Sequence, residues 1–89
     1  MFDHDKTIEE LEEDYNHARM IKERLLNALL QYEKQLRAID LRHADDDKFI
    51  RKQLIEKIDE TKLHILHIDD TMRKTEYMIK FLTAIKQGR

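Results

Sequence analysis

Apolar residues recur at steps of three and four along most of the chain, which has no proline and a single glycine, Gly88. This spacing places them on one side of an α-helix, and a seven-residue repeat with apolar a and d positions is typical of coiled coils. In the first half the a and d positions hold Ile8, Leu11, Tyr15, Ala18, Leu25, Leu29, Tyr32, Leu36 and Ile39. Only Lys22 interrupts this seam, and Ile21 beside it is placed to fill the gap.

The second half carries a seam of its own, shifted by one residue from the register of the first. Its a and d positions hold Leu54, Ile58, Thr61, Ile65, Ile68, Met72, Thr75, Ile79 and Leu82. The apolar pattern stops only at residues 41–47, where the aspartates at 45–47 suit the start of a new helix. At the other end, Thr7 and Glu10 have the spacing of a capping box, which predicts the start of the first helix.

These patterns predict an all-α fold, an antiparallel two-helix hairpin of the coiled-coil type that forms a single domain over residues 1–89. We expect the first helix at about 7–42, a turn at about 43–46 and the second helix at about 46–86. One continuous helix remains an alternative, because the corner contains neither glycine nor proline.

Charge is distributed along the chain in four blocks that suit the hairpin. Residues 1–14 carry a net charge of −6, residues 15–44 carry +3, residues 45–61 carry −2 and residues 62–89 carry +3. A fold at the corner lays the acidic start beside the basic end. A parallel in-register dimer would instead stack the −6 block on itself, which specific pairing normally avoids.

A two-helix chain of this length buries little interior, so its core alone would be marginal. We therefore expect a homodimer in which two hairpins form a four-helix bundle.

The second helix has more apolar residues than one seam requires. Leu63, Leu66, Tyr77 and Phe81, with Ala84 beside them, fall on a narrow stripe roughly opposite the seam. A helix that is apolar on two opposite sides is usually buried on both. Three interpretations stay open: a homodimer interface, a docking site for a different protein, since aromatic residues are enriched in binding hot spots, or exposed side chains without a role.

No combination of residues points to catalysis, a cofactor or a metal. The chain has no cysteine and no serine, its five threonines lack a neighbouring base, and there is no glycine-rich phosphate loop. His64 and His67 are three residues apart and His17 would come near them, but the heptad positions of His17 and His67 face outward and diverge. We expect a protein that is not an enzyme and holds neither cofactor nor metal.

Net charge and hydropathy narrow the classes of partner. With 17 basic and 19 acidic residues and a pI of about 6.2, the chain does not resemble a dedicated nucleic-acid binder. It has no run of 18 apolar residues that would span a membrane. Its start lacks the features of a signal peptide, and the absence of cysteine agrees with a reducing compartment, so we expect a cytoplasmic protein.

The function that the sequence favours is protein–protein interaction, by a small adaptor, inhibitor or assembly factor that acts through the apolar faces of the second helix. One alternative is a small transcriptional regulator or nucleic-acid accessory protein. That alternative rests on the basic residues of the first helix, which are Arg19, Lys22, Arg24, Lys34, Arg37 and Arg42. The other alternative is a structural coiled-coil spacer, whose function is its length.

Overall fold

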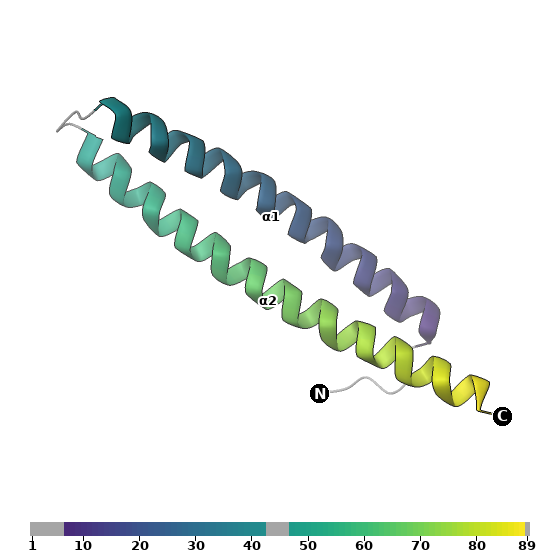
Figure 1. Cartoon of the computed structure of the whole chain (residues 1–89). Helices are drawn as coiled ribbons and strands as arrows, with labels where there is room; N and C mark the ends of the chain where they lie inside the picture. The colour runs from purple at the N-terminus through teal and green to yellow at the C-terminus, as the bar shows by residue number, and fades with distance from the viewer. Residues whose placement is uncertain (1–6, 43–46, 89) are drawn as a thin grey trace.

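Two long helices lie side by side in the computed structural model, which describes residues 7–42 and 47–88 (Figure 1). Helix α1 spans Ile8–Arg42, helix α2 spans Lys48–Gln87, and the two run antiparallel. The two-helix hairpin predicted from the sequence is confirmed, while the expected turn at about 43–46 lies outside the described residues. One continuous helix is wrong, because the molecule is 67 Å long and an 80-residue helix would extend about 120 Å.

Each helix begins beside a residue of the capping type, but only the first is capped by a side chain. The backbone amide of Glu10 donates to Thr7 Oγ1 at 3.2 Å, and the Thr7 hydroxyl donates to the Glu10 carboxylate at 3.4 Å. Asp47 occupies the N-cap of α2 with φ −90° and ψ 0° and makes no side-chain capping bond. A side-chain cap normally requires an extended backbone at the N-cap residue, and Asp47 does not have one. Its carboxylate lies 3.5 Å from Arg42 Nη2 instead.

Four cross-helix contacts define the register of the hairpin. They are Lys22 Nζ–Asp69 Oδ1 at 2.5 Å, Arg51 Nε–Asp40 Oδ1 at 2.8 Å, Arg42 Nη2–Asp47 Oδ2 at 3.5 Å, and Lys57 Nζ at 5.7 Å from the centre of the Tyr32 ring. In each pair the two residue numbers add up to 89 or 91. Residue i of α1 therefore lies beside residue 90 − i of α2, which sets every a position of one helix against a d position of the other.

Some layers of the seam place a small side chain opposite a large one across the helices. In this register Ala18 lies opposite Met72 and Leu29 lies opposite Thr61, an arrangement that lets facing layers interdigitate. Thr61 is buried, and its hydroxyl donates to the carbonyl of Lys57 at 2.7 Å. A polar residue therefore sits inside the seam with its hydrogen bond satisfied.

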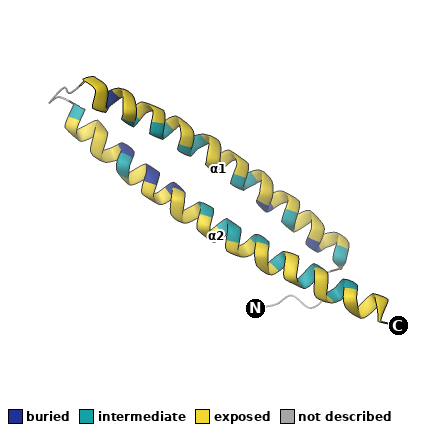
Figure 2. Ribbon diagram, in the orientation of Figure 1, coloured by how far each residue is buried: buried dark blue, intermediate teal, exposed yellow. Residues whose placement is uncertain are grey.

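The core is thin, because only two helices form it. Figure 2 shows buried positions only where the helices face each other, with exposed surface elsewhere. The buried apolar residues, each 6–7% exposed, are Leu11, Ala18, Ile39, Leu54 and Ile58. No large side chain among the described residues is completely buried. The chain exposes 7590 Å², about 2,000 Å² more than a compact monomer of its mass would.

Candidate interaction surface

The outer stripe, which we define as Leu63, Leu66, Tyr77 and Phe81, lies on α2 away from the seam. These side chains are 65%, 64%, 73% and 54% exposed, respectively. They recur at helical spacing on a side of α2 that α1 does not cover, because the seam residues of α2 face α1 and lie half a turn away. The hairpin thus leaves all four predicted interface residues accessible.

An ion pair divides the outer stripe into two apolar pairs. Lys74 Nζ lies 3.1 Å from Asp70 Oδ2, one helical turn apart and between the two halves of the stripe. Leu63 and Leu66 lie on one side of it, and Tyr77 and Phe81 on the other. The centres of the two pairs are about 22 Å apart along the helix. A partner would therefore meet two apolar contacts with a polar contact between them.

Sequence reasoning missed Phe49, a further residue on this side of α2. Phe49 is 69% exposed and occupies the same heptad position as Leu63 and Tyr77, which follow it at intervals of fourteen residues. That fourteen-residue interval was the signal that could have found it. On α1 the exposed large apolar residues are Met20, Leu26, Leu30 and Leu41.

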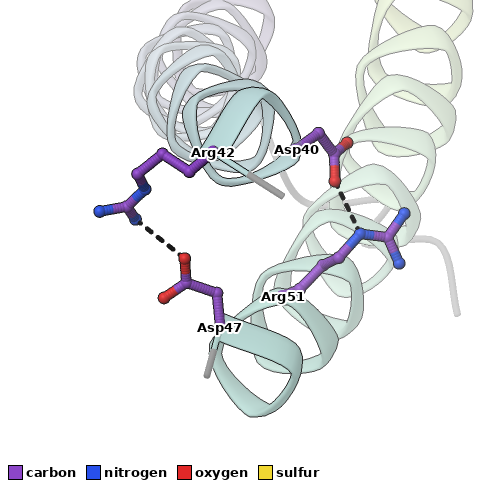
Figure 3. Close-up of polar contacts among 4 residues, drawn as sticks. All are labelled: Asp40, Arg42, Asp47 and Arg51. Carbon is purple, nitrogen blue, oxygen red and sulfur yellow. Dashed lines mark hydrogen bonds and ion pairs between the residues drawn. The ribbon is translucent and has the colours of Figure 1, made fainter. Parts of the chain in front are cut away.

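The hairpin also has two long edges, where the flanks of both helices meet solvent on either side of the seam. Figure 3 shows the Asp40–Arg51 pair on one edge and the Arg42–Asp47 pair on the other. Lys22–Asp69 lies on the same edge as Asp40–Arg51, because both pairs join an a position to an e position. We call this the charged edge, and the opposite one the apolar edge.

The histidines do not form a metal site in the described part of the chain. His17, His64 and His67 are all exposed. No group of three or more histidine, aspartate or glutamate residues within residues 7–42 and 47–88 is arranged to hold a metal ion.

The basic residues of α1 do not share a face. The six that favoured a nucleic-acid function occupy six different heptad positions, so they are spread around the helix. Two of them have acidic partners: Lys22 pairs with Asp69 and Arg42 with Asp47. A groove-binding protein gathers its positive charge on one face, and this arrangement does not provide one.

Comparison with protein-family models, curated protein sequences and solved structures finds no match to this chain. In the part of the chain that the structure describes, neither helix is long and apolar enough to cross a membrane.

Proposed function

We propose that the hairpin is a non-enzymatic protein–protein interaction module, acting as a small adaptor, inhibitor or assembly factor in the cytoplasm. The observation that carries the proposal is the outer stripe, whose four large apolar side chains are each more than half exposed. Two of the four are aromatic, and aromatic side chains dominate the energetics of protein interfaces. The stripe lies on a rigid helix, so a partner would dock without ordering a loop.

We also propose that the hairpin self-associates into a four-helix bundle. The large exposed area and the absence of any completely buried large side chain among the described residues support this proposal. A second hairpin would cover seam residues such as Leu25, Ile68 and Leu82, which are only half-buried between two helices.

The docking proposal can be tested by site-specific photocrosslinking in cells that produce the protein. A photoreactive phenylalanine analogue replaces Phe81 in one variant and Lys62, which is exposed on the charged edge of the same helix, in the control. We expect a defined adduct with a different protein at Phe81 and none at Lys62. Mass spectrometry of the adduct identifies the partner.

A second variant tests whether the adduct depends on the whole stripe. Leu66→Gln combined with Tyr77→Gln removes two apolar contacts at exposed positions, so the hairpin should stay helical by circular dichroism while the Phe81 adduct disappears. If Phe81 yields no adduct, or only one with a second copy of the hairpin, the stripe does not dock a different protein.

A further inference from the structure

The two edges of the hairpin differ sharply in charge. The charged edge is formed by every seventh residue from Glu12 to Asp40 and from Lys48 to Thr83, and eight of these eleven residues are Asp, Glu, Lys or Arg. The apolar edge is formed by every seventh residue from Asp14 to Arg42 and from Ile50 to Ile85, and only three of its eleven are charged.

We infer that a second copy of this chain docks along the apolar edge, and that the outer stripe is not the dimer interface. The apolar residues of this edge come from both helices and are Ile21, Ala28, Ile50, Met78 and Ile85. The hairpin leaves Ile50 and Ile85 48% and 49% exposed. The inference rests on the self-association proposed above, but not on docking of a different protein to the stripe.

Two polar residues of the apolar edge, Lys57 and Thr71, already have partners within the hairpin that are compatible with burial. Lys57 folds its ammonium over the Tyr32 ring of the other helix, at 5.7 Å from the centroid, a contact that strengthens when water is removed. Thr71 already donates its hydroxyl to the His67 carbonyl at 3.1 Å. On the charged edge, by contrast, the charges are already paired within one hairpin, Asp40 with Arg51 and Lys22 with Asp69. Both ion pairs remain accessible to water.

The available area is sufficient for a stable dimer. The hairpin is 20 Å wide, and a face as long as α1 is about 52 Å long, so two copies would bury about 2,000 Å² in total. Stable interfaces bury about 1,200–2,000 Å². Because an identical surface meets itself, the contact would be two-fold symmetric.

Charge on the apolar edge favours one alignment of the two copies. Asp14 lies near the open end of α1 and Arg42 at the corner. If the second hairpin runs in the reverse direction, Asp14 of each copy comes level with Arg42 of the other, and Ala28, midway between them, comes level with itself. A small residue at that crossing lets the two α1 helices approach closely.

The test places charge on the apolar edge without touching the seam. His64 and Thr71 are exposed within the hairpin, so His64→Glu with Thr71→Glu should leave its helicity intact. The matched control is Asn16→Glu with Asn27→Glu, which makes the same change in net charge at exposed positions of α1. Sedimentation equilibrium then gives the dimer dissociation constant of each variant.

We expect the edge variant to weaken the dimer at least 100-fold, because acidic side chains would be buried without partners, and the control to change it less than about threefold. A wild-type chain that stays monomeric refutes self-association as a whole. An edge variant that dimerises as tightly as the control overturns the choice of edge alone.

Disulfide trapping supplies a second readout, since the chain has no cysteine of its own. Ala28→Cys should form a covalent dimer rapidly under mild oxidation, and Leu66→Cys should not. The opposite result would place the dimer interface on the outer stripe and overturn the inference.

Discussion

Two leucines on the same helix provide a direct test of which surfaces of α2 are covered. Leu54 is 6% exposed in the seam and Leu66 is 64% exposed on the outer stripe. Leu54→Ala and Leu66→Ala delete the same three carbon atoms from the same element, twelve residues apart. Any difference between the variants therefore reports burial rather than residue chemistry.

The expected magnitudes follow from the exposed fractions. Each buried methylene contributes about 0.8 kcal/mol, so the three carbons of Leu54 contribute about 2.3 kcal/mol when almost all of their area is covered. A residual cavity adds to that loss, but the thin core lets the site collapse, which keeps the total for Leu54→Ala at about 2–3 kcal/mol. For Leu66→Ala we expect less than about 1 kcal/mol, partly offset by the higher helix propensity of alanine.

Thermal unfolding followed by circular dichroism at one fixed protein concentration measures both effects. In a domain of this size 1 kcal/mol corresponds to about 4–8 °C in Tm, so Leu54→Ala should unfold about 10–20 °C below wild type and Leu66→Ala within about 5 °C of it. Equal losses for the two variants would refute the reasoning, because they would mean that the outer stripe is covered in the purified protein.

Two further substitutions test the seam and the helix start. Lys22→Met should raise Tm by a few degrees, since its partly exposed ion pair with Asp69 contributes at most about 1 kcal/mol and a thioether would bury more apolar area. If Lys22→Met lowered Tm, and by more than Asp69→Asn does, the ion pair would contribute more than this reasoning allows. Thr7→Ala should cost about 1 kcal/mol of local stability, seen as faster amide hydrogen exchange at Glu10. Unchanged exchange there would show that the cap is not formed.

The heptad repeat made the hairpin predictable from the sequence. The apolar a and d residues face the partner helix as expected, and the two registers read from the sequence belong to two separate helices, α1 and α2. Lys22 looked like a defect in the seam of one helix. Across the hairpin it is matched by Asp69 of the other, a pairing that becomes visible only once the register between the helices is known.

Other features depend on three-dimensional details that no one-dimensional pattern carries. Asp47 was a reasonable N-cap by residue type, but its backbone conformation and the proximity of Arg42 direct its carboxylate to an ion pair. The contrast between the two edges required the positions of both helices at once. The partner of the outer stripe is encoded in another molecule, so neither the sequence nor the fold of this chain supplies it.

The register has a consequence for how the chain assembles. Asp40 and Arg51 are 11 residues apart, whereas the sequence separation between Lys22 and Asp69 is 47 residues. Closing the longer loop directly from the unfolded chain costs about 1.3 kcal/mol more in entropy than closing the shorter one. The folding route with the smallest entropic cost therefore starts with the residues nearest the corner. The helices then pair layer by layer toward the open end, because each new layer closes only a short additional loop. Ile8 and Leu82, at the open end of the seam, would be the last to meet during folding.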